Sequence, residues 1–517
     1  MATRKRTQGG GAKKRTAGGR RGESARSRSE TARKAPAGEA TKKGTKKAPA
    51  GVLVWEDDPM SGLPPITRPV PDISEAPLAT RITDAAAPEA GVYAVGTQEF
   101  RYWAAAEALR RAADFWGRLL PAGLRWFTGA DLPVTLDRGA ELNAYYDRRG
   151  LQFFHENVAG TTVYSGESPD IVCHEFGHAV LDAVRPQLWD VVGIEAAAFH
   201  EAFGDVSAIL CALELPSVRV SILAETGGRI YRNSRLSRLG EQLGWGIRHS
   251  NPHLVDPDSL RNAVNSFFYR DPETLPPSAP AYALSTEPHS FSRIFTASFL
   301  EALGVMLRAI SGEPTAEDLL KVSRNAGRIL LDAVTDAPVV PDYFTQVAAH
   351  MVEAAEGTPY KEGIQSTFVR RGILSLKSAS TMNTKGASVS ERRGIASMVP
   401  VEAEKTGEAP VPQIPLAISE YGLSVRALMV SAPGQTKRLP VKPAAVSIGS
   451  MSAPSEEVAA RSFVEDLFRR GRVDIKEHGE EDSETVHPFT RKTHELSRQG
   501  DSVILVRRTF DCGFDAF

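Results

Sequence analysis

Two histidines four positions apart raise the first chemical question. The segment SPDIVCHEFGHAVLDAV, residues 168–184, carries His174 and His178, with Glu175 directly after the first histidine. In a helix, positions i and i+4 lie on one face, so both imidazoles can donate a nitrogen to the same metal ion. A glutamate beside such a pair can accept a proton from a water molecule that the ion activates. The spacing therefore predicts a zinc site with a neighbouring general base.

A catalytic zinc ion needs a third protein ligand. The segment EAAAFHEAFGDVSAILCALEL supplies Glu201 and Asp205, again four positions apart and surrounded by apolar residues. We expect Glu201 to complete a His-His-Glu ligand set, and Asp205 to accept a hydrogen bond from the far nitrogen of a ligand histidine. Glu195 is a rival third ligand, but no acidic residue follows it at the fourth position. Without a metal, the same helix would carry a solvated or salt-bridged carboxylate pair.

The two segments together resemble a known family. HEFGHAVLD followed by HEAFGD resembles the gluzincin metallopeptidases, specifically the thermolysin-like ones, over residues 90–350. The resemblance implies an α+β fold, with an N-terminal mixed α/β lobe that carries the H-E-x-x-H helix and a mainly helical C-terminal lobe. It also implies one catalytic zinc ion and hydrolysis of peptide bonds in a peptide or protein substrate, with Glu175 as the general base.

Five further residues fall at positions of the family's catalytic and substrate-binding groups, four of them as matches and Trp189 as a replacement. Asn143 and Ala144, in ELNAYY, match an Asn-Ala pair on the edge strand that aligns the substrate backbone. His289, in EPHSFSRIFTASFLEAL, matches a histidine that stabilises the transition state. Trp189 stands where the family has a tyrosine, and its indole N–H could donate to the oxyanion. Arg248, in IRHSNP, matches an arginine that binds the substrate.

The chain also departs from the family. Ala212 occupies a position of the family's acidic calcium cluster, so we expect no structural calcium. Trp189 replaces the tyrosine, and we find neither a secretion signal nor a long folding propeptide. These departures leave open a second hypothesis, a zinc-binding interaction protein without peptidase activity. A third alternative, a nucleic-acid binder with a structural zinc ion, would need a fourth protein ligand, and none is evident.

Helices and one hairpin must position these residues. Apolar residues recur at helical spacing in residues 100–120, in residues 168–214 with a break near RPQLWDVVG, and in residues 291–356. The segment LNAYYDRRGLQFFHE predicts two strands joined by a turn around Arg149 and Gly150.

Changes in composition divide the chain into five parts. The middle part carries every candidate site residue, and the last part predicts one helix and one strand. We expect the following order: a disordered basic tail (1–50), a Pro-rich linker (51–90), the metallopeptidase catalytic domain (91–375), a low-complexity linker (376–455) and a small C-terminal segment of unknown role (456–517).

Charge is concentrated at the N-terminus. The chain has 517 residues and a net charge of −1, but its first 50 residues hold 16 Lys or Arg against three Glu, which leaves −14 for the remainder. Such a segment, without aromatic residues, buries too little apolar area to fold alone. We expect it to contact nucleic acid or another polyanion non-specifically. The alternative is a solvated tail without a partner.

Cysteine usage and hydropathy indicate the compartment. The three cysteines, Cys173, Cys211 and Cys512, are odd in number and far apart, which argues against a disulfide scaffold. No run approaches the length of a membrane-spanning helix. The basic N-terminus has no apolar stretch behind it, as a secretory signal would. We therefore expect a cytoplasmic protein without membrane contact.

Overall fold

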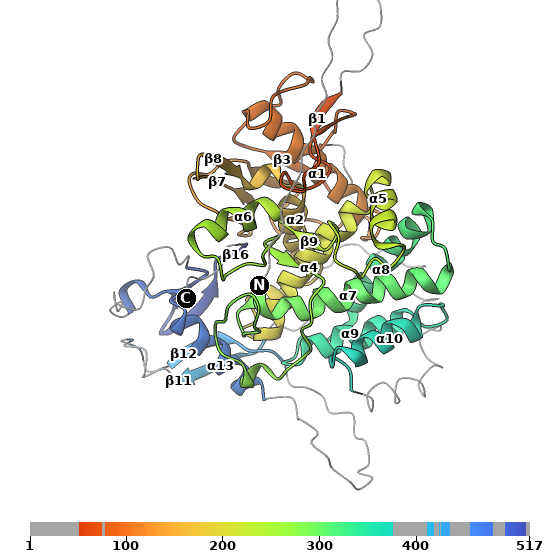
Figure 1. Ribbon diagram of the computed structural model, residues 1–517. Helices are drawn as coiled ribbons and strands as arrows, with labels where there is room; N and C mark the ends of the chain where they lie inside the picture. Colours follow the sequence, from red (N-terminus) through yellow and green to blue (C-terminus); the bar gives the residue numbers. More distant parts are fainter. Residues whose placement is uncertain are drawn as a thin grey trace, which may run out of the picture. The chain divides into compact units, whose positions relative to one another are not determined.

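The N-terminal half contains long helices and four strands of a five-stranded mixed sheet, whose fifth strand comes from the C-terminal part (Figure 1). The computed structural model describes residues 51–74, 78–375, 411–417, 423, 425, 427–434, 455–478 and 492–512, which belong to one compact unit. The strand order is β16-β5-β6-β4-β3, with β3, β4 and β6 parallel and the other two pairs antiparallel. These strands are β3 (Thr80–Ile82), β4 (Leu132–Thr135), β5 (Ala144–Tyr146), β6 (Leu151–Phe153) and β16 (Phe510–Asp511).

The predicted hairpin is confirmed in β5 and β6. Its turn requires glycine, because a Cβ on Gly150 would lie 2.3 Å from the carbonyl oxygen of Pro133, and φ at Gly150 is +157°. Three two-stranded sheets surround this region: β1 (Val52–Val54) with β2 (Ile66–Arg68), β7 (His155–Val158) with β8 (Thr161–Tyr164), and β9 (Arg238–Leu239) with β10 (Arg261–Asn262).

The predicted helical segments are confirmed, including the break. Helix α1 is Gln98–Gly117, α2 is Pro169–Val184, α3 is Gln187–Asp190 and α4 is Ile194–Ala212. Helix α2 begins where the sequence provides a start signal, because Ser168 caps it, accepting from the N–H of Ile171, and Pro169 occupies its first position. Helices α2 and α4 lie side by side, so their facing residues can form one site (Figure 1).

The middle of the chain is mainly helical. Helices α8 and α9 pack against each other, and α10 packs on α7 (Figure 1). These helices are α5 (Pro216–Thr226), α6 (Glu241–Ser250), α7 (Pro288–Ile310), α8 (Ala316–Asp336), α9 (Tyr343–Ala354) and α10 (Lys361–Arg370). Among the described residues, no single helix has the length and apolarity of a membrane span, and only the bent pair α4 and α5 passes that test when taken together.

The C-terminal part forms a second five-stranded sheet, of order β11-β12-β15-β14-β13, with one helix. The predicted helix and strand are present as α13 and β15. The elements are β11 (Gln413–Ala417), β12 (Ala427–Ser431), α13 (Glu456–Arg469), β13 (Val473–Asp474), β14 (His494–Gln499) and β15 (Ser502–Arg507). The protein is therefore a mixed α+β protein with a mixed sheet first and a helical middle region.

Two segments that we predicted as linkers contain strands. Residues 51–90 include β1, β2 and β3, and residues 376–455 include β11 and β12. Strands β1 and β2 pair with each other, as do β11 and β12, but β3 and β12 also pair with distant strands, Ile82 with Val134 and Met429 with Ile504. Local composition carries no signal for the distant pairings. The basic tail, residues 1–50, lies outside the described residues, so its polyanion contact stays a prediction.

Candidate metal centre

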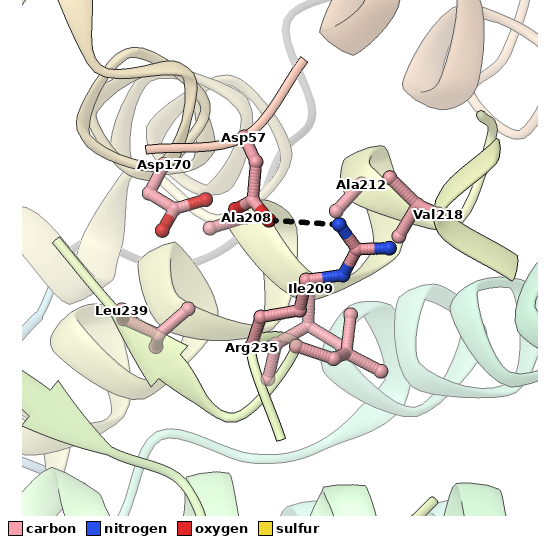
Figure 2. A pocket seen from close by; sticks show the side chains of 9 residues that line it. Asp57, Asp170, Ala208, Ile209, Ala212, Val218, Arg235 and Leu239 are labelled. Atoms are coloured by element: carbon pink, nitrogen blue, oxygen red, sulfur yellow. Dashed lines mark ion pairs between the residues drawn. The ribbon is translucent and has the colours of Figure 1, made fainter. Parts of the chain in front are cut away.

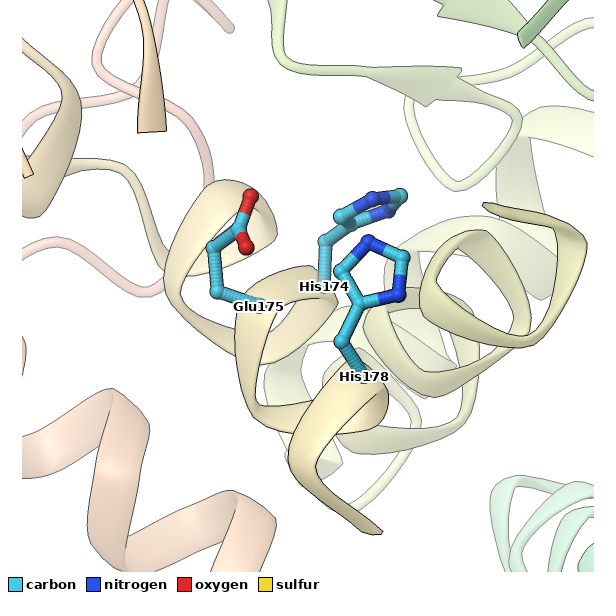
Figure 3. Close-up of side chains that lie close together, drawn as sticks. All are labelled: His174, Glu175 and His178. Carbon is cyan, nitrogen blue, oxygen red and sulfur yellow. The ribbon is translucent and has the colours of Figure 1, made fainter. Parts of the chain in front are cut away.

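Three side chains of α2 form a group that could hold a metal ion. His174, Glu175 and His178 are all buried, and one ligand atom from each lies within 4.8 Å of the others (Figure 3). The one-turn spacing of the histidines places both imidazoles on the face of α2 that packs against α4. The expected pair is thus present, in a region with little access to water.

Glu201 of α4 approaches the two imidazoles. Its carboxylate oxygens lie 3.4 Å from Nε2 of His174 and 3.7 Å from Nε2 of His178. Ligands held at about 2.1 Å around a tetrahedral zinc ion are separated from each other by about 3.4 Å. The observed separations therefore suit three donors around one ion, and they are longer than an ordinary hydrogen bond.

The donor atoms also make no hydrogen bond within the described part of the chain. Nε2 of His174, Nε2 of His178 and Oε2 of Glu201 are buried and have no hydrogen-bond partner among the described residues. Buried polar atoms are normally satisfied, because leaving one unpaired costs about 1–3 kcal/mol. Three such atoms converging at one place fit a cation, and the donor set of two imidazoles and one carboxylate is one that zinc accepts.

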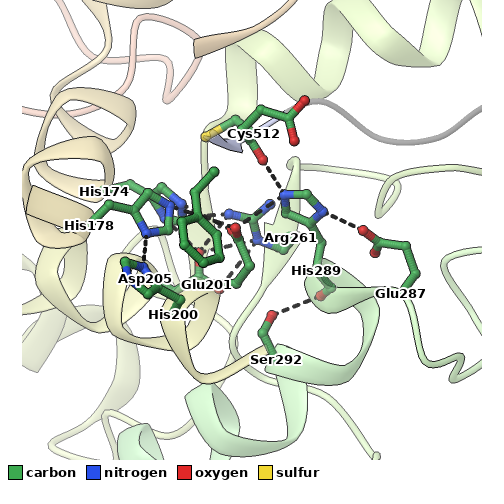
Figure 4. Close-up of polar contacts among 12 residues, drawn as sticks. His174, His178, His200, Glu201, Asp205, Arg261, Glu287, His289, Ser292 and Cys512 are labelled. Atoms are coloured by element: carbon green, nitrogen blue, oxygen red, sulfur yellow. Dashed lines mark hydrogen bonds and ion pairs between the residues drawn. The ribbon is translucent and has the colours of Figure 1, made fainter. Parts of the chain in front are cut away.

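Groups behind the histidines fix their orientation (Figure 4). Oδ1 of Asp205 lies 3.1 Å from Nδ1 of His174, and Arg261 of β10 donates to the same oxygen at 2.8 Å. Nδ1 of His200 lies 2.8 Å from Nδ1 of His178. Both far nitrogens are thus engaged, which leaves both Nε2 atoms to face Glu201.

Sequence reasoning missed two of these groups. His200 stands directly before Glu201, and its ring reaches across to His178 although adjacent helix positions point in different directions. The proximity of His200 to Glu201 in sequence was the available signal. The sequence gives no signal for Arg261, because only the short pairing of β9 with β10 brings this residue to the site.

The electrostatics favour a metal-binding form of His178. Burial, and then the charge of His174, hold the pKa of His178 well below its usual range, so the ring stays neutral. Burial alone would lower the pKa of His174, but the nearby carboxylates of Asp205 and Glu201 outweigh burial and raise it to about 9. The carboxylates therefore create a place for positive charge, which a proton or a metal ion can supply.

His289 of α7 faces the same carboxylate. Its Nε2 lies 3.3 Å from Oε2 of Glu201, and its Nδ1 lies 2.6 Å from Oε1 of Glu287. Burial opposes protonation of His289, but Glu201 and Glu287 outweigh it and raise the pKa to about 9. His289 therefore carries a proton near neutral pH and can donate it in a hydrogen bond.

Glu175 lies beside the donors with one oxygen unpaired. Its Oε1 accepts from Sγ of Cys512 at 2.8 Å, and its Oε2 is buried without a hydrogen-bond partner among the described residues. Burial raises the pKa of Glu175 to about 8. A carboxyl group whose pKa lies near neutrality is suited to accept and return a proton.

Three of the expected substrate residues lie on or against β5, and the fourth, Arg248, makes its contact elsewhere. Ala144 is the first residue of β5, and Asn143 precedes it, with Oδ1 accepting from the N–H of Ala144 at 2.8 Å. Trp189 is buried on α3, where its ring contacts Tyr146 at a centroid distance of 5.5 Å. Arg248 of α6 instead donates to the carbonyl of Asp256 at 2.7 Å, in the loop that follows this helix.

The rival ligand Glu195 is engaged elsewhere. Its Oε1 accepts from the hydroxyl of Tyr269 at 2.5 Å, and its Oε2 accepts from the N–H of Phe344 at 2.7 Å. Both oxygens are thus used to join α4 to α9 and to the loop before α7. Glu201, not Glu195, faces the histidines.

Replacing Glu195 with glutamine is expected to flatten the pH dependence of stability. Burial raises the pKa of Glu195 to about 8, above its ordinary 4.5. The folded protein therefore holds a proton that the unfolded chain releases, so this contribution to stability is present at low pH and lost as pH rises towards 8. Relative to the variant, the wild type should lose free energy of unfolding between about pH 5 and pH 8. Urea unfolding of both proteins at several pH values measures the free energy of unfolding. A difference between the two proteins that does not change across this pH range would contradict the raised pKa of Glu195.

A glycine lets α4 approach the His174 ring. A Cβ on Gly204 would lie 2.6 Å from Cε1 and 2.7 Å from Nδ1 of His174, closer than such atoms approach. The ring cannot simply turn aside, because Asp205 and Arg261 contact its Nδ1. Gly204 is thus required for the position of this imidazole.

The Gly204→Ala variant is expected to bind zinc about 10- to 100-fold more weakly, the loss typical of a displaced ligand orientation. Gly193→Ala is the matched control, since it changes the cap of the same helix and its Cβ would meet nothing within 4 Å. Competition with a chelating dye measures both affinities. Equal affinities in the two variants would show that the close approach is unimportant.

A second polar cluster fixes the start of α2. Asp57 and Asp170 line a cavity with Arg235, whose Nη1 lies 3.7 Å from Oδ2 of Asp57 (Figure 2). Asp58 accepts from the hydroxyl of Ser168 at 2.6 Å, and burial raises the pKa of Asp58 to about 6. These contacts anchor the first turn of the helix that carries the histidines.

Comparison with known proteins adds no relative. No family model matches the chain, and no curated protein matches it. The site is therefore defined by its own geometry, a buried His174–Glu175–His178 group that could hold a metal ion.

Proposed function

We propose that this protein is a zinc-dependent metalloendopeptidase, similar in its site to the gluzincins. The observation that carries the proposal is the convergence of three buried donor atoms, from His174, His178 and Glu201, beside a buried glutamate; none of the three has a hydrogen-bond partner among the described residues. A structural site would not need the unpaired oxygen of Glu175 next to the donors. A hydrolytic site needs such a base.

His174, His178 and Glu201 would hold the ion. Zinc held there would supply Lewis acidity, which activates a water molecule and polarises a carbonyl group. Glu175 would accept the proton of the attacking water and pass it to the leaving nitrogen. Asp205 and His200 would keep the two imidazoles oriented through their far nitrogens.

The remaining groups would bind the substrate. His289, whose Nε2 lies 3.3 Å from Oε2 of Glu201, would donate from that nitrogen to the oxyanion of the tetrahedral intermediate. The edge of β5 at Ala144 would align a peptide backbone by strand addition. The ring of Trp189 packs edge-on against Tyr146 of this strand.

Metal-dependent cleavage of an unfolded protein tests the proposal. Casein should be cut by the protein, cutting should stop with 1,10-phenanthroline, and added zinc should restore it. The test includes chains in which residues 509–517 are removed, because residues 509–512 contact the site. Bound zinc without cleavage in any of these chains would contradict the peptidase and favour a zinc-binding interaction protein.

A further inference from the structure

We propose that residues 509–512 occupy the substrate site of the candidate zinc centre and hold the enzyme latent. This inference rests on the proposed peptidase function, whose own site the segment covers. The segment lies more than 300 positions after α2 in the chain, yet each of its last three residues contacts a different functional part of the site.

The segment pairs with the edge of β5 that β6 leaves free. Strand β6 pairs with one side of β5, and β16 pairs antiparallel with the other, Phe510 opposite Tyr146 and Asp511 opposite Tyr145. The N–H of Cys512 then donates to the carbonyl of Ala144 at 2.9 Å. A peptide substrate that binds by strand addition needs these same backbone groups.

The next two contacts engage the groups proposed for the chemistry. The carbonyl oxygen of Asp511 lies 2.5 Å from Nε2 of His289, the donor proposed for the oxyanion. The thiol of Cys512 donates to Oε1 of Glu175, the proposed base, at 2.8 Å (Figure 4). The carbonyl of Asp511 therefore contacts His289, the proposed oxyanion donor, and the side chain of Cys512 blocks Glu175, the proposed base.

Phe510 covers the histidines from the side. Its ring stacks on His200, with centroids 3.8 Å apart and an interplanar angle of 16°, and also lies against His178 at 5.3 Å. Glu175 and His178 are 0% exposed, and Cys512 is 0% exposed. A substrate cannot reach Glu175 in this arrangement unless the segment moves away.

The C-terminal sheet holds the segment in place. The carboxylate of Asp511 lies 3.3 Å from Nη1 of Arg472, and the guanidinium of Arg507 lies 4.1 Å from the centre of the Phe510 ring. Nε of Arg507 donates to the carbonyl of Trp189 at 3.0 Å. The second sheet thus presents residues 509–512 to the site, which gives this part of the chain a regulatory role.

Truncation tests the inference. A chain ending at Arg508 should keep its zinc and cleave casein about 10-fold faster or more, because a site that is open less than about a tenth of the time gains at least that factor. A chain ending at Cys512 is the length control and should match the full chain. Equal rates in all three chains, with zinc bound, would overturn the inference while the peptidase stands.

Point variants guard against a folding defect in the truncated chain. Cys512→Pro, in the full chain, removes both the N–H that Ala144 accepts and the thiol on Glu175. Cys512→Ser keeps an N–H and a hydroxyl that can donate. We expect the proline variant to be activated and the serine variant to stay latent. Equal rates in the two variants would overturn the inference.

A binding measurement separates the inference from the proposed activity. A fluorescent peptide of residues 506–512 should bind the chain ending at Arg508 and not the full chain, as measured by anisotropy. If no chain cleaves casein but the peptide shows this difference, the segment does cover the site and the peptidase proposal fails. Peptide binding that is equal for the two folded chains overturns the inference.

Discussion

The Glu201→Ala variant is expected to bind zinc about 100-fold more weakly than the wild type. Structural zinc sites with four ligands bind with about 10–16 kcal/mol, so one ligand is worth roughly 3 kcal/mol, and 1.4 kcal/mol corresponds to a factor of ten. The carboxylate lies 3.4 and 3.7 Å from the two imidazole nitrogens, and its Oε2 has no hydrogen-bond partner in the part of the chain that the structure describes. Its removal should leave only the two histidines.

Glu195→Gln is the matched control for this variant. Glu195 is also a buried glutamate of α4, but its oxygens are used by Tyr269 and Phe344. Zinc affinity, measured by competition with a chelating dye, should be unchanged in the control. Wild-type affinity in Glu201→Ala would show that Glu201 is not a ligand, and the His-His-Glu assignment would fail.

The Glu175→Gln variant is expected to lower kcat for casein cleavage by about 100- to 10,000-fold, the usual contribution of a general acid–base group. Glutamine has the same shape but cannot take up a proton. Zinc content should not change, because the donor atoms belong to His174, His178 and Glu201. The rate is measured on the full chain and on the chain ending at Arg508, so that a latent site does not hide the effect.

Glu167→Gln is the control for loss of a buried carboxyl group. Glu167 lies just before α2 and, like Glu175, has a pKa raised by burial, to about 7, but it is not part of the donor group. Its replacement should leave both the rate and the zinc content as they are. Full activity in Glu175→Gln would remove Glu175 from the mechanism.

Local pattern was sufficient for the centre of the site. The i, i+4 spacing of His174 and His178 fixed which helix face carries the donors, and apolar neighbours indicated that α2 and α4 are buried. The same reasoning placed Asp205 next to a ligand histidine, where the structure has it 3.1 Å from Nδ1 of His174. Helix geometry makes such short-range relations readable from sequence.

Relations between distant segments were not readable. Both Arg248 and Arg261 lie in a turn-rich part of the chain, and only the pairing of β9 with β10 brings Arg261 to Asp205. Strand β16 is two residues long and pairs with β5 across more than 360 positions, so it leaves no periodic pattern. The C-terminal cover of the site could therefore emerge only from the folded chain.

The zinc content of the full chain tests the central claim most directly. The purified protein is equilibrated with zinc, separated from free metal and measured by mass spectrometry, beside a His174→Ala, His178→Ala double variant. We predict one zinc ion per wild-type chain and none in the double variant. A wild-type chain without zinc, or a double variant that retains it, would contradict the metal centre.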